Sequence, residues 1–177
     1  MLYKNDKIKL NNDKWKELVM FNFVIKNSER KCIPVTEDDI KRIEGKFGIV
    51  FPDSLRKYYI EYNGKYIHTI YFPVEGENYN VGVDDIIPLI GSAPNYNVES
   101  IKDDELNCGW VSKNLIPFAI TEGGDEFYWD ANEGKVYVIF ADDGEDENGM
   151  LIPRYICSSI DEMFRLMSEA YDKKMYG

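Results

Sequence analysis

The chain has 177 residues, a length that favours one domain built around a contiguous core. A composition of 44% hydrophobic and 14% aromatic residues excludes an intrinsically disordered protein, even though 30% of the residues are charged. Lysine and arginine number 21 against 32 aspartates and glutamates, so the formal net charge is −11. A chain this acidic is poorly suited to bind nucleic acid or an anionic membrane, but it is compatible with a basic protein partner.

Cysteine usage and targeting signals indicate a cytoplasmic protein. Cys32, Cys108 and Cys157 are far apart, odd in number and without a CxxC motif, which fits free thiols better than a disulfide framework. Residues 1–7 lack the apolar core of a secretory signal. The most apolar run, residues 18–25, is far shorter than the ~20 residues that span a bilayer.

Helix signals begin weakly near the N-terminus. Asn12 or Asp13 can cap a helix that starts near Lys14. Residues 18–25 are apolar without a clean period, so helix and buried strand both remain open for them.

Residues 36–47 are predicted to form a capped helix. Thr36 and Asp39 have the spacing of a capping box, and acids in the first turn suit the positive end of the helix dipole. Apolar residues then recur on one face at Ile40, Ile43 and Phe47.

A second helix is predicted over residues 52–62. Pro52 suits its first position because the fixed φ of proline is already helical. Asn63-Gly64 is expected to end it, since both residue types tolerate the left-handed cap conformation. Its inner face is formed by Leu55, Tyr58, Tyr59 and Tyr62.

The middle of the chain has the pattern of strands joined by tight turns. Strand-like runs cover residues 66–72, 85–90, 115–120, 126–130 and 136–140. Glycine-containing turns at 122–125 and 132–134 join the last three runs, so we expect antiparallel hairpins. Residues 95–109 are polar and are predicted to be a loop with at most a short helical turn.

The C-terminal part adds an acidic loop over residues 142–149 and a helix over 159–171. Ser159 and Glu162 have the spacing of a capping box at the start of that helix. The order of two helices, several strands and a final helix predicts an α+β fold. We expect an antiparallel β-sheet over residues 66–140, flanked by the N-terminal helices and the C-terminal helix.

No catalytic or metal-binding constellation stands out. His68 is the only histidine, and no nucleophile or orienting acid is singled out beside it, so a structural role is favoured. The cysteines lack metal-ligand spacing, and the acidic run lacks the alternation of an EF-hand loop. Gly45-Lys46-Phe47-Gly48 is not a phosphate-binding loop. We therefore expect neither a cofactor nor a metal, and binding rather than catalysis.

Two groups of acidic residues are the candidate functional residues. One surrounds a turn and strand, with Glu122, Asp125, Glu126 and Asp130, and the other is the run Asp142, Asp143, Glu145 and Asp146. If residues 127–130 and 136–140 pair as strands, both groups lie towards hairpin ends of one sheet. We expect this negative surface to bind a protein partner, although such acids can also serve only solubility. A small carbohydrate-active or metal-dependent enzyme is a further alternative, motivated by these clusters alone.

A series of short motifs runs along the chain in a defined order. Residues 36–44 form an acidic helix with an Ile-Glu pair, Gly48-Ile49-Val50-Phe51-Pro52 forms a junction, and the next helix ends in Tyr62-Asn63-Gly64. Ile116-Pro117-Phe118-Ala119, Gly124-Asp125-Glu126-Phe127 and Gly134-Lys135-Val136-Tyr137 follow. In order and spacing these motifs resemble the signature of the SUKH superfamily over about residues 34–172. Lys65 departs from it, because the family usually has a second glycine there.

The resemblance implies a non-catalytic, protein-binding domain. Bacterial members resemble immunity proteins that neutralise a toxin domain, often a nuclease, and fungal members regulate cell-wall assembly and glucan synthesis. The first role implies a cytoplasmic protein that occludes a basic toxin domain without a cofactor; the alternative is a regulatory scaffold. Residues 1–33 have no counterpart in the family, so we expect them to be an extension packed on a SUKH-like domain of residues 34–177.

Overall fold

A computed structural model describes residues 21–27, 29–73, 78–91 and 93–176. Its helices are α2 (Glu37–Phe47), α3 (Asp53–Tyr62), α4 (Val98–Cys108) and α5 (Ile160–Tyr176), with a short 3-10 helix η1 (Ala141–Asp143). Its strands are β1 (Ile70–Pro73), β2 (Asn80–Val83), β3 (Asp85–Ile86), β4 (Leu115–Ile120), β5 (Glu126–Asp130), β6 (Val136–Ile139) and β7 (Pro153–Cys157). The helix expected near Lys14 lies outside the described residues.

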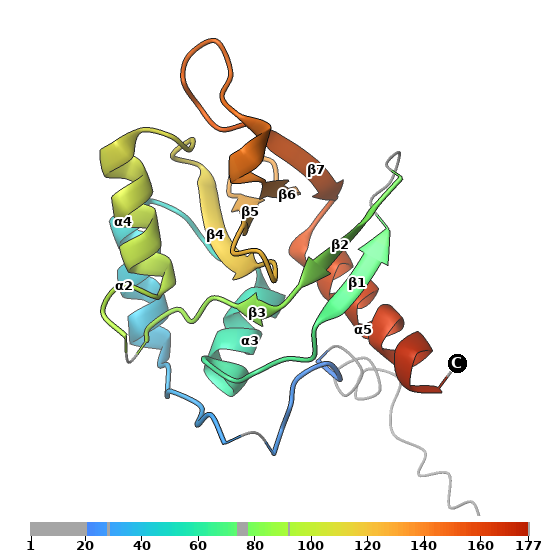
Figure 1. The fold of residues 1–177 in the computed structure, drawn as a ribbon. Coiled ribbons are helices and arrows are strands. Elements are labelled where there is room, and N and C mark those ends of the chain that lie inside the picture. The colour runs from blue at the N-terminus through green and yellow to red at the C-terminus, as the bar shows by residue number, and fades with distance from the viewer. Residues whose placement is uncertain (1–20, 28, 74–77, 92, 177) are drawn as a thin grey trace, which may run out of the picture.

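The strands form two antiparallel sheets. Five of them pair in the order β3-β4-β5-β6-β7, and β1 and β2 form a separate ribbon. Figure 1 shows α2 and α4 side by side at one end of the structure and α5 with the β1–β2 ribbon at the other. The predicted α+β fold, with an antiparallel sheet and helices before and after it, is therefore confirmed.

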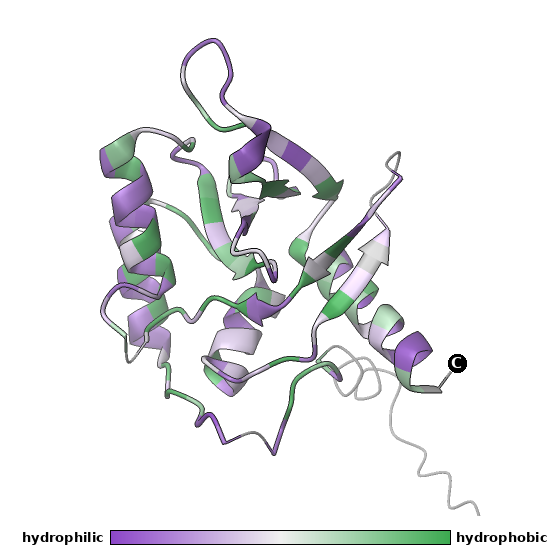
Figure 2. Cartoon of the chain, viewed as in Figure 1, coloured by the Kyte–Doolittle hydropathy of each residue, from purple (hydrophilic) through white to green (hydrophobic). Residues whose placement is uncertain are grey.

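The central strands bury both of their faces. Along β5, Phe127 and Trp129 belong to the main core, whereas Tyr128 between them packs on the opposite face with Val111 and Ile139. This alternation is the period of two expected of a strand. Figure 2 shows the hydrophobic colour following β4, whereas the loop between β6 and β7 is largely hydrophilic.

Local capping explains where the predicted helices begin. Thr36 and Asp39 form the expected capping box, with the Asp39 amide donating to the Thr36 hydroxyl at 3.2 Å and the Thr36 amide donating to the Asp39 carboxylate at 2.9 Å. Pro52 lies one residue earlier than predicted, at the N-cap of α3. At α5 only half of the expected box forms, because the Glu162 carboxylate accepts from Ser158 rather than Ser159.

Three elements were not predicted. Residues 98–108, expected as loop, form α4, because Asn97 and Ser100 make a capping box and Gly109 (φ 74°) supplies the left-handed end. Only Val98 and Lys102 of this helix are buried, so it has almost no apolar pattern. Strands β2 and β7 were also missed, and of the predicted runs 66–72 and 85–90 only the segments β1 and β3 pair as strands.

Part of the N-terminal segment lies in the main core. Val24 forms an isolated bridge with Ile67, and the Phe21 ring lies 5.3 Å from the ring of Phe164 and 5.5 Å from that of Tyr58. Phe21, Phe23 and Val24 thus complete the core between α3 and α5. That residues 1–33 form an extension packed on a domain of residues 34–177 stays a prediction.

Asn63 connects three segments of the chain at the end of α3. Its side-chain oxygen accepts from the Leu89 amide at 2.7 Å, and its side-chain nitrogen donates to the carbonyls of Ile33 and Ile90 at 3.2 and 2.9 Å. The residue is fully buried. The predicted end of the helix at Asn63-Gly64 is confirmed, and of these two residues Gly64 (φ 74°) adopts the left-handed conformation.

Replacing this side chain is expected to destabilise the whole fold. Asn63→Ala leaves the buried Leu89 amide and the partly buried carbonyls of Ile33 and Ile90 without this partner, so the free energy of unfolding should fall by about 2–4 kcal/mol. Urea unfolding followed by circular dichroism measures this change. Asn107→Ala, at an exposed position on α4, is the matched control and should change stability by less than about 0.5 kcal/mol. Equal effects of the two substitutions would contradict the role assigned to Asn63.

Candidate functional site

The turn between β4 and β5 holds the first group of predicted acids. The Thr121 hydroxyl accepts from the amides of Gly123 and Asp125, each at 3.1 Å, and donates to the Asp125 carboxylate at 3.2 Å. Gly124 adopts φ 89°, which completes the tight turn. The tip of this rigid turn carries Glu122, whose carboxylate accepts a hydrogen bond from the Tyr71 hydroxyl of β1.

The second group of acids begins beside the same turn. Glu126 pairs with Ile139 in the register of β5 and β6, so the chain that leaves β6 runs next to Asp125. The Ala141 amide of η1 donates to the Asp125 carboxylate at 3.2 Å. The predicted pairing of these two strands is confirmed, and it brings Asp142 and Asp143 to the end of the sheet that carries Glu122 and Asp125.

Two acids of the β6–β7 loop have structural partners. Asp143 forms a bidentate ion pair with Arg154 of β7, and the Arg154 guanidinium also donates to the Tyr79 hydroxyl at 3.1 Å. Asp146 accepts from the amides of Asn148 and Met150 at 2.8 and 3.0 Å. The bonds from Met150 and then Asn148 lower the pKa of the Asp146 carboxyl. These two residues hold the loop in place.

Asp130 does not join the other acids. It lies at the opposite end of β5 from Glu126, about 14 Å away at 3.4 Å per residue. Its carboxylate is buried and accepts from the amides of Asn132 and Glu133 at 2.8 and 3.0 Å and from the Asn114 side chain at 2.7 Å. The expectation that it lies near the loop of residues 142–147 is wrong, since it holds the β5–β6 turn instead.

The remaining predicted residues form what we call the acidic edge. Its members are Glu122, Asp125, Glu126, Asp142, Asp143, Glu145 and Asp146. Within the described part of the chain, Glu122, Asp142 and Glu145 are exposed and make no ion pair. Uncompensated carboxylates of this kind attract a cationic surface.

Glu126 differs from the exposed acids because it is half-buried against α4. Burial raises the pKa of its carboxyl to about 7, and the nearby carboxylates of Glu105 and Asp125 act in the same direction. Glu105 accepts from the Tyr128 hydroxyl at 2.6 Å and from Lys102 at 3.3 Å. Lys102 is fully buried, and loss of hydration lowers its pKa.

Sequence reasoning missed this cluster because Lys102 and Glu105 lie in the segment predicted to be a loop. The available signal was the capping-box spacing of Asn97 and Ser100 before Gly109. A helix over these residues places Lys102 and Glu105 on nearly the same face, three positions apart.

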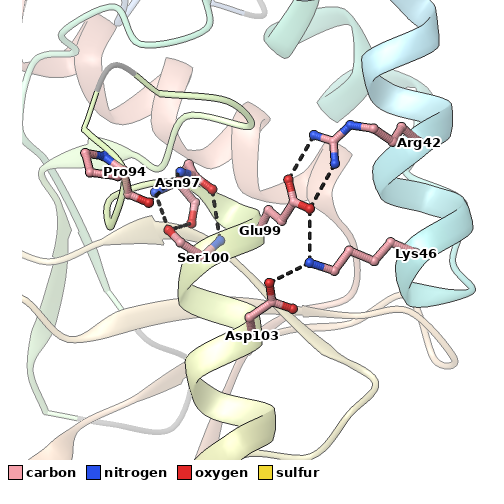
Figure 3. A network of polar contacts seen from close by, with 7 residues as sticks. All are labelled: Arg42, Lys46, Pro94, Asn97, Glu99, Ser100 and Asp103. Atoms are coloured by element: carbon pink, nitrogen blue, oxygen red, sulfur yellow. Dashed lines mark hydrogen bonds and ion pairs between the residues drawn. The ribbon is translucent and has the colours of Figure 1, made fainter.

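A second polar network joins α2 to α4. Glu99 accepts from Arg42 at 2.9 Å and from Lys46 at 3.0 Å, and Lys46 also pairs with Asp103 at 2.5 Å. Figure 3 shows the two cations reaching across from α2 to the carboxylates of α4. The bond from Arg42 is the main cause that lowers the pKa of Glu99 to about 2. This network orients two helices, and its charges are largely satisfied within it.

The described residues do not assemble a metal-binding cluster. His68 lies away from the acidic edge, with its ring 5.0 Å from that of Tyr171 on α5. No cluster of three or more histidine, cysteine or acidic side chains is positioned for a metal within the part of the chain that the structure describes. Nor is any helix there long and apolar enough to cross a membrane.

The raised pKa of Glu126 predicts a pH-dependent contribution to stability. At pH values between the ordinary pKa of glutamate and about 7, the Glu126 carboxyl keeps its proton in the folded state but has lost it in the unfolded state. The free energy of unfolding therefore falls as pH rises through that window. Glu126→Gln removes this loss. Its free energy of unfolding should exceed that of the wild type by about 1 kcal/mol at pH 8, a value reduced for partial solvent exposure, and match it near pH 4.

Urea unfolding at pH 4, 6 and 8 measures this difference. Glu122→Gln, at the exposed tip of the same turn, is the matched control and should not change the pH slope. A parallel pH dependence of the wild type and Glu126→Gln would show that Glu126 does not titrate in this window.

Comparison with known proteins agrees with the motifs and the fold. The sequence model of the SMI1 / KNR4 family (SUKH-1) matches residues 34–166, which is most of the chain. No curated protein and no solved structure matches it. The matched region runs from just before α2 into α5, and it includes the acidic edge and the α2–α4 network. The chain therefore belongs to the SMI1 / KNR4 (SUKH-1) family.

Proposed function

We propose that this protein is an immunity protein that neutralises a cognate toxin by binding it stoichiometrically. The SUKH-1 family includes immunity proteins and SMI1/KNR4 regulators, its members bind protein partners, and it is generally non-catalytic. The observation that favours the immunity role is the acidic edge. Three of its carboxylates, those of Glu122, Asp142 and Glu145, are exposed and are neutralised by no described cation, in a chain of net charge −11.

The chemistry of the acidic edge suits a toxin that acts on nucleic acid. Such an enzyme needs a cationic surface to hold phosphate groups, and carboxylates on an inhibitor complement that surface. Covering the surface blocks the substrate without any reaction by the inhibitor. Complementary charge of this kind mainly speeds association and selects the partner.

The free thiols agree with action in the cytoplasm. Cys157 is buried, Cys32 is half-buried and Cys108 is exposed, and all three are free. A reducing compartment keeps such cysteines in the thiol form. A cytoplasmic immunity protein would meet the toxin where its target lies.

Co-expression with a candidate toxin, taken from any toxin gene that lies immediately upstream, tests the proposal. Cells that produce this toxin should resume growth when the protein is produced with it. The purified pair should elute as one complex, and toxin activity should reach zero near a 1:1 ratio. Full toxin activity in the presence of excess protein would refute the proposed function for that pair.

Neutralising the exposed acids should slow association with that toxin. The variant Glu122→Gln, Asp142→Asn, Glu145→Gln leaves Asp143 and Asp146 in place, because these two residues hold the loop. Its association rate at low salt should fall about tenfold, and the rate should depend less on ionic strength. Stopped-flow fluorescence at 20 and 300 mM NaCl measures both effects, and the melting temperature should hardly change.

The matched control removes three negative charges elsewhere. The control is the triple variant Glu29→Gln, Glu61→Gln, Asp104→Asn, whose three positions are exposed and lie outside the acidic edge. It changes the net charge of the protein by the same amount as the first variant. If this control slows association as much as the first variant, the effect comes from total charge. In that case the acidic edge is not the docking surface.

A further inference from the structure

A groove opens at the other end of the sheet, away from the acidic edge. It has a volume of about 640 Å³ and lies between the C-terminal end of α2, the side of α4, and the turn between β5 and β6. This volume is within the range of about 300–1,000 Å³ typical of binding clefts.

The walls of the groove expose apolar side chains. Val50, in the connection between α2 and α3, is 75% exposed, and Leu106 on α4 is 43% exposed. Phe47, Ile49 and Ala131 continue the apolar surface between them. Apolar surface gathered in one concavity gains free energy when a partner covers it, whereas single exposed residues scattered over a protein have no such meaning.

The charge of the groove is opposite to that of the protein. Among the described residues, its lining includes Lys46 and Lys113 but no aspartate or glutamate, in a chain where acidic residues outnumber basic ones by 32 to 21. Lys46 is held at the rim by Glu99 and Asp103, as Figure 3 shows. Lys113 is exposed and makes no ion pair with any residue that the structure describes. A carboxylate brought to this rim would therefore find a cation available for pairing.

The distribution of polar groups fits a protein segment better than a small molecule. Small-molecule sites bury a few convergent polar atoms within an apolar pocket. Here, none of the lining side chains contributes a buried polar atom without a partner. Of the polar lining residues, Lys113 and Asn132 are exposed at the margin, whereas the partly buried Asn114 side chain donates to Asp130. An apolar centre with a polar rim is the anatomy of a protein–protein interface.

We propose that this groove is a second docking site, and that it binds a partner segment presenting a large apolar side chain next to a carboxylate. The apolar side chain packs between Val50 and Leu106, and the carboxylate pairs with Lys113. This site is independent of the acidic edge, which attracts the opposite charge. The two surfaces lie beyond opposite ends of β5.

Selection from a library of random peptides tests the proposal on the full chain. A phage-displayed library of 12-residue peptides is selected against the wild-type protein, and enriched peptides are synthesised with fluorescein. Their affinities are measured by fluorescence anisotropy. Enriched peptides should combine a Leu, Ile, Met, Phe or Trp with a neighbouring Asp or Glu.

Variants of the groove then locate the bound peptide. Leu106→Asp should weaken its affinity about tenfold or more, and Lys113→Glu several-fold, with Lys113→Arg restoring most of the affinity. Val50→Asp changes a second apolar wall of the groove, at a position that is 75% exposed and therefore outside the core. It replaces Leu106→Asp in the test if that variant fails to fold. The matched controls are Ile60→Asp, on the exposed side of α3, and Lys41→Glu, on the exposed side of α2. Both should leave the affinity unchanged.

Three results would overturn the proposal. The first is the absence of any enriched peptide, and the second is enrichment of basic peptides. The third is an affinity that Val50→Asp and Leu106→Asp leave intact. The Glu122→Gln, Asp142→Asn, Glu145→Gln variant should bind the peptides like the wild type, so failure here is distinguishable from failure of the proposed immunity function.

Discussion

The arrangement of the domain depends on how the buried Asn63 side chain satisfies backbone groups of two other segments. The carboxamide has both a donor and an acceptor end, and the residue uses both on segments far apart in sequence, at Ile33, Leu89 and Ile90. No apolar or purely acidic side chain can meet that combination of partners. Through these bonds the end of α3 positions the chain that enters α2 and the chain that follows β3. The edge of the five-stranded sheet is thereby tied to the helical layer.

Buried ionised side chains also hold elements of the fold together. Glu44, in the Ile-Glu pair of the family motif, is nearly buried in α2, where it accepts from the Phe51 amide at 2.8 Å and from Arg56 of α3. Asp85 of β3 pairs with Arg30 at 2.7 Å, although burial still raises the pKa of its carboxyl. An ionised group loses hydration on burial, so it stays charged only where such partners are supplied. The recognisable family motif therefore organises the fold more than it marks a binding surface.

The two proposed surfaces follow from the path of the chain at opposite ends of β5. At one end, tight turns and η1 project acids whose neighbours are mostly backbone amides and other acids, so negative charge accumulates there. At the other end, α2 and α4 stop short of the β5–β6 turn and leave Val50 and Leu106 facing a groove. Recognition on this domain accordingly relies on the loops and helix ends around the sheet, while the sheet itself is a rigid support.

Sequence alone determined those elements whose pattern is local. Each of these patterns lies within a few neighbouring residues, and each was predicted correctly. They are the capping box at Thr36, the apolar stripes of α2, α3 and α5, and the glycine turns between β4, β5 and β6. Tertiary structure decided the rest. Helix α4 has almost no apolar pattern, and β2 and β7 become strands only by pairing with β1 and β6. The carboxylates of Asp130 and Asp146 accept hydrogen bonds within turns, and that of Asp143 pairs with Arg154. Which acids remain free and where a groove opens depend on contacts between distant segments, and no local sequence period records those contacts.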